Sequence, residues 1–345
     1  MPEISVVVPF YKVNEKFLEK CIQSLIGQTE RNIEILIVSD GAADSSIKKC
    51  KQFAEEDIRI KVIEQDDQGV AVARNNGLKQ ASSPYITFVD ADDWVEPEFC
   101  QTFIKAFKEN PDVEIISVAA FLNKEAEERK NPFWEGKEKY FVGKEKDQIQ
   151  LQSIFKESSS FVPPFATFGT TWAKAYRRDW LIEQHIFYEP ELRRGQDTLF
   201  NLHAFEKANK IYYIEKYLYH YRRNEGSTVN KYTDNVIEIL EKISEYILQF
   251  ITTYHKDERF YQAYCQKSIQ LLSQAINCDY LHKENPKPYL TKRKELKMAL
   301  ARENYKNIFR KVRMKNIPVA RKLYWFLMRY QLADVIFLAH YFFAK

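Results

Sequence analysis

The sequence predicts an α/β protein, with a mostly parallel sheet covered by helices on both faces and a helical C-terminal region after it. The first 120 of the 345 residues alternate short apolar runs with segments of helical periodicity. This alternation is typical of right-handed βαβ crossovers. Beyond residue 232 the apolar residues recur at helical spacing only. Nine glycines are too few for a turn-dense all-β architecture.

Nine elements are expected in the first 120 residues. Short apolar runs bounded by turn residues predict buried strands at 3–10, 33–41, 59–65, 84–90 and 113–120. Apolar residues at helical spacing predict helices at 14–29, 44–57, 69–81 and 97–110, and Pro97 suits the first turn of the last one.

The pattern loosens between 121 and 170 and then recovers. Residues 131–136 and 158–171 are expected to be loops. Helices are expected at 170–184 and 196–208, and an edge strand at 210–223. We therefore expect a first domain over 1–228, with a nucleotide-binding half of about 1–120 and an acceptor half of about 121–228. A helical region with a basic, aromatic-rich end is expected over 229–345.

Polar residues follow four of the predicted strands, at 9–11, 39–41, 65–69 and 90–93. Parallel strands end at the same edge of a sheet, and ligands bind outside that edge. Strand geometry places Asp90 and Asp92 on one side, with Asp93 at the bend. A divalent cation would make these clustered carboxylates tolerable, and Mg²⁺ or Mn²⁺ bound to a phosphate-bearing ligand suits such oxygen ligands. The alternative is that Asp92 and Asp93 cap the following helix.

Other phosphate chemistries fit this sequence less well. It contains neither the GxxxxGK[ST] loop of a P-loop protein nor a GxGxxG after its first strand. An aspartate-nucleophile phosphatase would carry its DxD on the first strand, whereas here it follows the fourth. A sugar nucleotidylyltransferase would have a Gly- and basic-rich loop where this chain has "PFYKVNEKF".

Five motifs in order resemble family 2 glycosyltransferases, which are inverting enzymes of the Rossmann-like GT-A fold. They read "SVVVPFYK", "IEILIVSDGAADSS", "GVAVARNNGL", "YITFVDADDW" and "GQDTLF". The resemblance covers residues 3 to about 227, because "YLYHYRRNEGS" is also similar to a stretch of many bacterial members. It implies a hexosyl- or N-acetylhexosaminyltransferase in bacterial surface polysaccharide synthesis. The donor would be a UDP-sugar and the acceptor a glycan or a lipid-linked oligosaccharide.

The resemblance also assigns roles to residues. The implied donor-binding residues are Pro9, Tyr11, Asp40, Arg74, Asp90 and Asp92. Among these, Pro9 and Tyr11 would line the pocket of the base, Asp40 would hydrogen-bond that base, and Arg74 would lie near the diphosphate. Asp92 and Asp93 would hold the metal ion. The family's usual pair of acids reads Ser39-Asp40 here, and Gln196 stands where many members have Glu.

Asp197 matches the general base of the family. An acceptor hydroxyl is a poor nucleophile, so a carboxylate must take its proton as it attacks the anomeric carbon. Attack opposite the leaving group inverts the configuration. Local sequence alone equally allows Asp197 to be a helix N-cap, and Arg74 to pair with a neighbouring acid. Another alternative is a non-catalytic sugar-nucleotide or glycan-binding module of the same fold.

Three residues are weaker candidates for the acceptor site: Trp172, Lys174 and Arg222. Trp172 and Lys174 precede a Tyr-Arg-Arg cluster, and Arg222 lies in the strand predicted at 210–223. The alternative for Trp172 is a place in the core, which is the commoner environment of a tryptophan.

The C-terminal end is basic and aromatic. Residues 292–322 hold twelve Lys or Arg and two Glu, and 317–345 hold eight aromatics. A peripheral contact of 292–345 with an anionic membrane is one interpretation, and a helical hairpin packed on the protein is the other. We recognise no nucleic-acid-binding module.

Five scattered cysteines, no signal peptide and no long apolar run predict a cytoplasmic protein, at the inner face of the membrane if the tail binds lipid.

Overall fold

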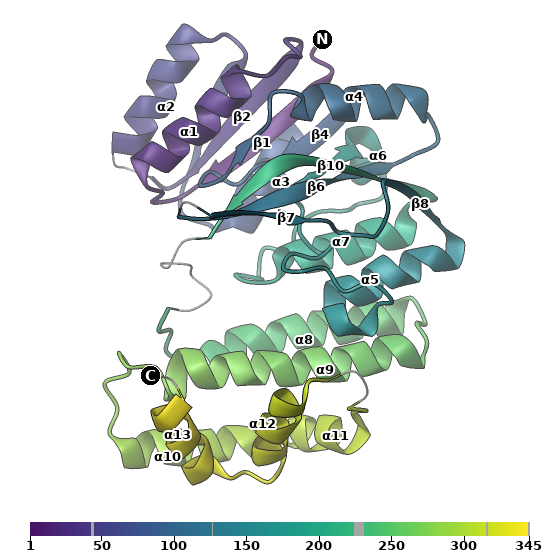
Figure 1. Cartoon of the computed structure of the whole chain (residues 1–345). Coiled ribbons are helices and arrows are strands. Elements are labelled where there is room, and N and C mark those ends of the chain that lie inside the picture. Colours follow the sequence, from purple (N-terminus) through teal and green to yellow (C-terminus); the bar gives the residue numbers. More distant parts are fainter. Residues whose placement is uncertain (43–44, 126, 224–230, 315–316, 344–345) are drawn as a thin grey trace. The chain divides into compact units, whose positions relative to one another are not determined.

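The computed structural model describes residues 1–42, 45–125, 127–223, 231–314 and 317–343, with the side chains of 341–343 left aside. The chain forms two compact units (Figure 1). The first consists of 1–153 and 161–224, and the second of 154–160 and 225–345. The boundary expected between 228 and 229 falls within 224–230, which lies outside the described residues, as does residue 44 at the start of a predicted helix.

The first unit is built on one mixed sheet. Its strands are β1 (Ile4–Phe10), β2 (Ile33–Asp40), β3 (Ile60–Gln65), β4 (Tyr85–Phe88), β5 (Trp94–Val95), β6 (Ile115–Lys124), β7 (Glu127–Asn131), β8 (Glu138–Val142), β9 (Lys174–Arg177) and β10 (Lys210–Arg222). They follow the order β3-β2-β1-β4-β9-β6-β10-β5, while β7 pairs with β6 and β8 with β10. The first four strands of that order are parallel, so their carboxyl ends share one edge.

Helices cover this sheet. They are α1 (Glu15–Ile26), α2 (Ser45–Glu56), α3 (Val70–Gln80), α4 (Phe99–Glu109), α5 (Lys146–Ile154), α6 (Arg178–Glu183) and α7 (Gln196–Lys207). The five strands and four helices expected in the first 120 residues are all present, with ends shifted by a few residues. The helix at 196–208 is confirmed as α7.

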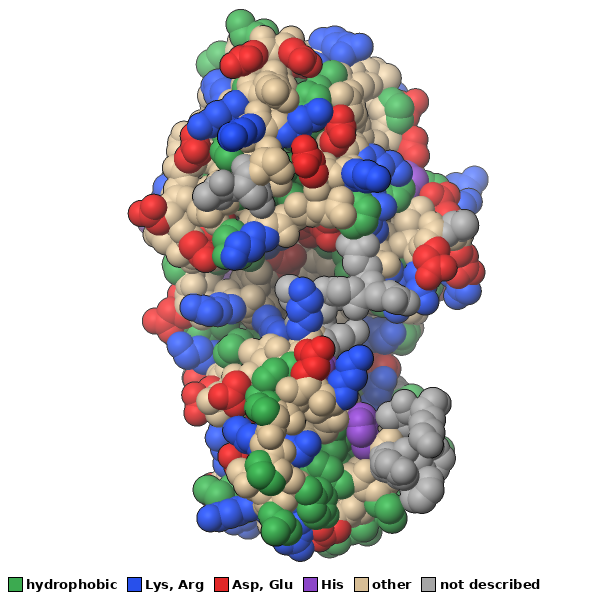
Figure 2. Space-filling model, turned by 90° about the vertical axis from the view of Figure 1, so that its left-hand side faces the viewer, with side chains coloured by type: hydrophobic (Ala, Val, Ile, Leu, Met, Phe, Trp, Pro, Cys, Tyr) green, Lys and Arg blue, Asp and Glu red, His purple; other side chains and the backbone are tan. Residues whose placement is uncertain are grey.

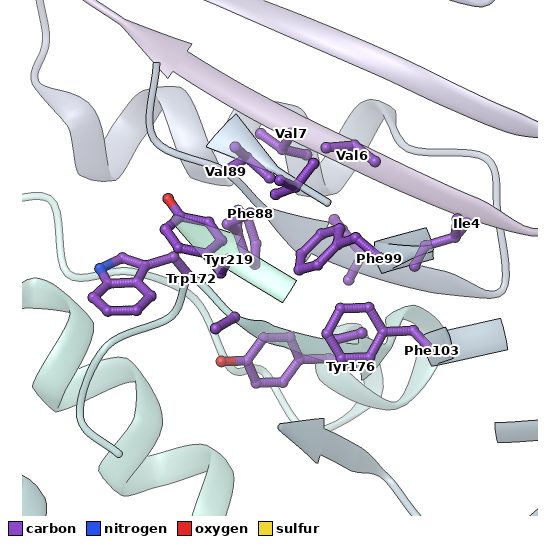
Figure 3. Packing of buried hydrophobic residues seen from close by; sticks show 14 of the residues in the cluster. Ile4, Val6, Val7, Phe88, Val89, Phe99, Phe103, Trp172, Tyr176 and Tyr219 are labelled. Carbon is purple, nitrogen blue, oxygen red and sulfur yellow. The ribbon is translucent and has the colours of Figure 1, made fainter. Parts of the chain in front are cut away.

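The core lies between the sheet and these helices. Every residue of β1 and β2 is buried, as the continuous apolar runs predicted. Figure 3 shows Val6 and Val7 of β1 packing beside Phe88 of β4, with Phe99 and Phe103 of α4 close by. Helix α3 lies tightly on β1, because a Cβ at Gly77 would come within 2.3 Å of Val7 Cγ1.

The helix expected over 170–184 is wrong in its first half. Residues 174–177 form β9, which is antiparallel to β4 and β6, and only 178–183 are helical as α6. Ala175 lies opposite both Thr87 and Ile116, and Lys174 and Tyr176 are fully buried. Pairing with two strands overrides the helical pattern, because it satisfies the backbone groups on both sides of a buried segment.

The strand expected at 210–223 is confirmed as β10, but it is not an edge strand. It pairs with β6 on one side and with β5 and β8 on the other. Tyr213 and Tyr219 are therefore completely buried. The loosely patterned stretch from 121 to 170 contains β7, β8 and α5, while 131–136 and 158–171 hold neither an α-helix nor a strand residue apart from Asn131 at the end of β7.

The second unit is helical, as expected. It contains α8 (Val236–Thr253), α9 (Glu258–Ala275), α10 (Tyr289–Leu300), α11 (Glu303–Lys311), α12 (Val319–Arg329) and α13 (Ala333–Phe343). The apolar stripe of α8 is buried at Leu240, Ile243, Ile247 and Phe250. Among the described residues, none of the helices is both long and apolar enough to cross a bilayer.

Candidate functional site

The carboxylate of Asp40 at the end of β2 organises the loop between β3 and α3. Its Oδ1 accepts a hydrogen bond from the Gln68 amide and its Oδ2 one from the Gly69 amide, both at 2.9 Å. The next residue, Gly41, has a φ of +72°, and a Cβ there would lie 2.8 Å from Asp67 N. Two of the predicted polar segments, 39–41 and 65–69, are therefore held together by hydrogen bonds. Asp40 therefore fixes the conformation of the 65–69 loop.

Pro9 and Tyr11 lie where β1 ends. They are next to the 39–41 segment, because Phe10 pairs with Ser39 of β2. Pro9 is buried, whereas Tyr11 is 42% exposed. An exposed aromatic ring at the carboxyl edge of a parallel sheet offers a surface on which a flat base can stack. The geometry suits the role expected for Tyr11.

The carboxylate-bearing turn after β4 is fastened by β10. Tyr219 Oη donates to Asp93 Oδ2 over 2.6 Å and accepts from the Asp90 amide over 3.1 Å. The Arg222 amide donates to Asp93 Oδ1 over 2.7 Å. Both oxygens of the fully buried Asp93 thus accept bonds from the protein itself. Figure 3 shows Tyr219 beside Trp172, reaching toward the end of β4.

Arg222, expected at the acceptor site, holds this turn with its side chain as well. Its Nε donates to the carbonyl oxygen of Asp92 over 2.8 Å. The guanidinium lies over the rings of Phe17, 4.0 Å from the centroid, and Trp94, at 4.7 Å. A cation placed over aromatic faces is held in a fixed orientation. The structure therefore gives Arg222 a positioning role for the carboxylates.

Arg74 joins three elements at the centre of the site. It is 4% exposed on α3, and its two terminal nitrogens donate to Asp197 Oδ1 over 2.6 Å and to Asp90 Oδ1 over 2.7 Å. Asp197 is in the first turn of α7, and Asp90 follows β4. The guanidinium also lies over the Tyr188 ring, 5.2 Å from its centroid. Arg74 therefore pairs with acids far away in sequence and not with a neighbour on its own helix.

Burial and mutual repulsion raise the pKa values of these carboxyl groups. Burial raises the pKa of Asp197, Arg74 lowers it, and Asp90 raises it again, with a net rise. Burial and the neighbouring Asp90 raise the pKa of Asp92 to about 6. Burial also raises the pKa of Asp93, and Asp92 and Asp90 add to the rise. A site that disfavours its own negative charge favours a cation or a proton there.

The carboxylates after β4 suit a divalent cation only in part. Carboxylate oxygens are the ligands that Mg²⁺ and Mn²⁺ prefer, and Asp90 and Asp92 supply them at the rim. Asp93 fits less well, because both its oxygens already accept hydrogen bonds and its side chain is buried. Within the described residues, no group of three or more His, Cys, Asp or Glu is arranged to hold a metal ion.

Trp172 and Lys174, the other expected acceptor residues, lie in the core. Trp172 is 4% exposed and stacks on Tyr219 and Tyr221, with centroids 4.7 and 5.3 Å apart. Lys174 is 0% exposed, and its Nζ donates to the carbonyl oxygen of Thr170 over 2.7 Å. Burial lowers the pKa of Lys174 to about 7, although Asp197 opposes the shift. We correct the expectation accordingly: these side chains support the site from within and do not face an acceptor.

Sequence reasoning missed Tyr219 and Tyr188. Tyr219 contacts the turn after β4 across 126 positions of sequence, and Tyr188 lies beneath Arg74. No local pattern distinguishes them from the other tyrosines of the chain, so the tertiary structure alone reveals their place. All five cysteines are buried free thiols.

Known proteins resemble this chain over both units. The model of Glycosyl transferase family 2 matches residues 5–183. EpsH of Bacillus subtilis (strain 168), which is named a glycosyltransferase, is 32% identical over 69% of this chain and 65% of its own length. The glycosyltransferase GlyA of Streptococcus pneumoniae serotype 4 is 34% identical over 69% of this chain and 33% of its own. The chain thus spans less than two thirds of either relative.

A solved structure shows the same fold. The crystal structure of Staphylococcus aureus TarS 1–349 in complex with UDP-GlcNAc has a TM-score of 0.62 at 18% identity and covers 98% of this chain and 91% of its own. This likeness confirms the expected GT-A architecture with a helical C-terminal region. The family match over more than half of the chain confirms the relationship inferred from the five motifs. This chain belongs to glycosyl transferase family 2.

Proposed function

We propose that this protein transfers a hexosyl or N-acetylhexosaminyl group from a UDP-sugar to a hydroxyl of a glycan or a lipid-linked oligosaccharide in bacterial surface polysaccharide synthesis. Its family membership and the UDP-GlcNAc in the TarS complex support a nucleotide-sugar donor. The observation that carries the proposal is the double ion pair of Arg74. It brings a carboxylate of α7 beside the carboxylates that follow β4.

The donor's nucleotide is proposed to bind at the carboxyl ends of β1 and β2. Tyr11 is the exposed ring for the base, and Pro9 forms the floor beside it. Asp40 holds the 65–69 loop against the same place through its two amide contacts. Arg74 is the cation proposed to lie near the diphosphate, and two carboxylates already share its charge.

A divalent cation, Mn²⁺ or Mg²⁺, is proposed to bind Asp92 and Asp90. When bound there it would neutralise the pyrophosphate of the donor and make the nucleoside diphosphate a better leaving group. Asp93 was expected to be a further metal ligand. Its contacts with Tyr219 and Arg222 support a different role, in which it fixes the turn that presents Asp92.

Asp197 is proposed to be the general base. It would accept the proton of the acceptor hydroxyl as the hydroxyl oxygen attacks the anomeric carbon, with inversion. Its raised pKa supports this role, because a carboxylate with a raised pKa is a stronger base. Arg74 holds Asp197 in one orientation through the 2.6 Å contact.

The substitution Asp197→Asn tests the catalytic assignment. We expect it to abolish UDP release from UDP-sugars, with water or an added glycan as acceptor, while UDP binding in the presence of Mn²⁺ persists in calorimetry. Asp179→Asn is the matched control, since Asp179 is an acid of the same unit whose side chain is 74% exposed. It should leave both measurements unchanged.

Two outcomes would contradict the proposal. If the unsubstituted protein binds UDP but never turns over any of a panel of UDP-sugars and glycan acceptors, the fold serves as a non-catalytic binding module. If it releases inorganic phosphate in a metal-dependent reaction without an acceptor, the carboxylates perform phosphatase chemistry. A peripheral contact of 292–345 with an anionic membrane is a separate part of the proposal.

A further inference from the structure

Helix α12 exposes a row of apolar side chains. Val319, Leu323, Phe326 and Tyr330 are 80%, 62%, 48% and 56% exposed. Their spacing of four, three and four residues places them on one side of the helix. The opposite side of α12 is buried through Trp325 and Met328. The row is therefore an outward face of a helix that is already anchored in the second unit.

The next segment, which leads into α13, also exposes apolar side chains. Leu332, Val335 and Leu338 are 38%, 43% and 57% exposed at a spacing of three, while Ala333 and Ile336 are buried. We call these seven exposed residues, which lie on the two helices and, at Tyr330 and Leu332, in the link between them, the α12–α13 face. Single exposed apolar side chains are common on proteins, whereas a row across two successive helices marks an interaction surface.

The charges beside the face are basic. The sequence from 318 to 333 contains no Asp or Glu. Lys322 precedes Phe326 by one helical turn, and in the part of the chain that the structure describes it has no ion-pair partner. Asp334, the one acid of α13, accepts a hydrogen bond from Tyr289 Oη over 2.8 Å and forms an ion pair with Arg293. The acid nearest to the face is thus neutralised within the unit.

The structure also narrows the larger region of 292–345 that the sequence singled out. Arg302, Arg313 and Arg321 form ion pairs with glutamates of the second unit. Tyr305 and Phe309 are buried. Figure 2 shows hydrophobic side chains, with Lys and Arg beside them, at the bottom of the view, over the part that holds α10 and α13. The α12–α13 face is thus the part of this region where exposed apolar side chains gather, although Met298 of α10 is exposed as well.

We propose that the α12–α13 face docks on an anionic lipid bilayer. Apolar and aromatic side chains flanked by Lys and Arg suit the interface, where rings insert among acyl chains and cations meet lipid phosphates. A second copy of the chain would place one basic face against another, and like charges oppose that contact. The inference rests on the proposed function in one respect: a membrane-bound protein would find a lipid-linked acceptor at the bilayer surface. Lipid binding itself does not depend on the donor site.

Sedimentation of the full chain with vesicles tests this inference. We expect it to bind vesicles of phosphatidylglycerol and phosphatidylcholine, to bind pure phosphatidylcholine vesicles weakly, and to release as salt rises from about 0.1 M to about 0.5 M. Leu323→Glu combined with Phe326→Glu should lower the partition coefficient by about tenfold or more. Lys322→Glu should lower it less, by about fivefold.

Ile58→Glu is the matched control for the apolar substitutions. Ile58 is 95% exposed in the first unit, so the change adds the same charge at an exposed apolar position away from the face. It should leave vesicle binding unchanged. UDP binding with Mn²⁺ and the melting temperature should be equal in all variants, which separates a loss of lipid binding from a loss of fold or donor site.

The inference is wrong if the unsubstituted chain does not sediment with either kind of vesicle, or if Leu323→Glu with Phe326→Glu binds as the unsubstituted chain does. It is also wrong if these substitutions convert a dimer into a monomer in analytical ultracentrifugation without changing vesicle binding. That outcome would assign the face to a second copy of the chain.

Discussion

The guanidinium of Arg74 donates to Asp197 over 2.6 Å although 123 positions of sequence separate the two residues. Its other terminal nitrogen donates to Asp90 over 2.7 Å. One buried cation thus joins α3, the turn after β4 and the start of α7. Burial alone would lower the pKa of Arg74, but the two carboxylates raise it, so the guanidinium stays charged. The proposed base and the proposed metal-binding turn share this one partner.

Arg74→Gln should therefore change the pH dependence of transfer. Arg74 lowers the pKa of Asp197, so its removal should raise that pKa further and move the acidic limb of the rate profile to higher pH. The rate of UDP release should fall by about tenfold or more, because the base is no longer held. Unfolding free energy should drop by about 3 kcal/mol, the lower end for a broken buried pair, since the two acids are 23% and 27% exposed.

Arg59→Gln is the control for this change. Arg59 is also paired with a carboxylate of the first unit, Asp57, at 2.6 Å. It should cost stability without moving the acidic limb. An unchanged limb in Arg74→Gln would refute the coupling between Arg74 and the base.

Tyr219→Phe should loosen the turn that carries the carboxylates. The substitution removes the hydroxyl that donates to Asp93 and accepts from the Asp90 amide. We expect a loss of about 2 kcal/mol of unfolding free energy, because buried Asp93 loses a donor, and UDP affinity in the presence of Mn²⁺ several-fold weaker in calorimetry. Tyr213→Phe removes a buried hydroxyl of the same strand that accepts from the Phe133 amide. It should destabilise the unit yet leave UDP affinity unchanged; equal effects on affinity would argue against the role of Tyr219.

Asp92→Asn and Asp93→Asn should behave differently if Asp92 binds the cation and Asp93 only fixes the turn. Chelation of divalent metal should weaken UDP binding by the unsubstituted protein by about tenfold or more. Asp92→Asn should bind UDP weakly and show little response to Mn²⁺. Asp93→Asn should mainly lower the melting temperature, because the oxygens of Asp93 accept hydrogen bonds from Tyr219 and Arg222. Calorimetry with and without Mn²⁺ measures both. A response to Mn²⁺ that survives in Asp92→Asn and vanishes in Asp93→Asn would reverse the assignment.

Lys174→Met should stabilise the first unit at neutral pH and below. Burial lowers the pKa of Lys174 to about 7, so the unfolded chain binds a proton that the folded chain lacks between about pH 7 and the usual lysine pKa near 10.4. The native protein should gain about 1.4 kcal/mol of unfolding free energy per pH unit in that window. In Lys174→Met this rise should disappear.

The carbonyl oxygen of Thr170 keeps a donor in that variant, because Asn201 Nδ2 also donates to it over 2.8 Å. Chemical denaturation at several pH values measures the effect, with the exposed Lys48→Met as control. A slope that persists in Lys174→Met would show that another group titrates in this window.

The local patterns that predicted the fold correctly are those of buried strands and amphipathic helices. The continuous run of Val6, Val7 and Val8 marks a strand that is buried on both faces, and the apolar stripe of α8 follows the period of a helix. The pattern failed at 174–177, where two neighbouring strands convert a helical sequence into β9. It also could not distinguish an edge strand from β10, because pairing partners are chosen by the tertiary fold.

The sequence by itself determined that acids follow β4 at the carboxyl-end edge of an α/β sheet, since strand ends and residue types are local properties. Only the tertiary structure decided how those acids are used. It showed that Tyr219 and Arg222 donate hydrogen bonds to both carboxylate oxygens of Asp93. It also showed that Arg74 pairs with both Asp90 and Asp197. Trp172 and Lys174 proved to lie inside the core. These contacts join residues far apart along the chain, and their geometry follows from packing, which no short stretch of sequence specifies.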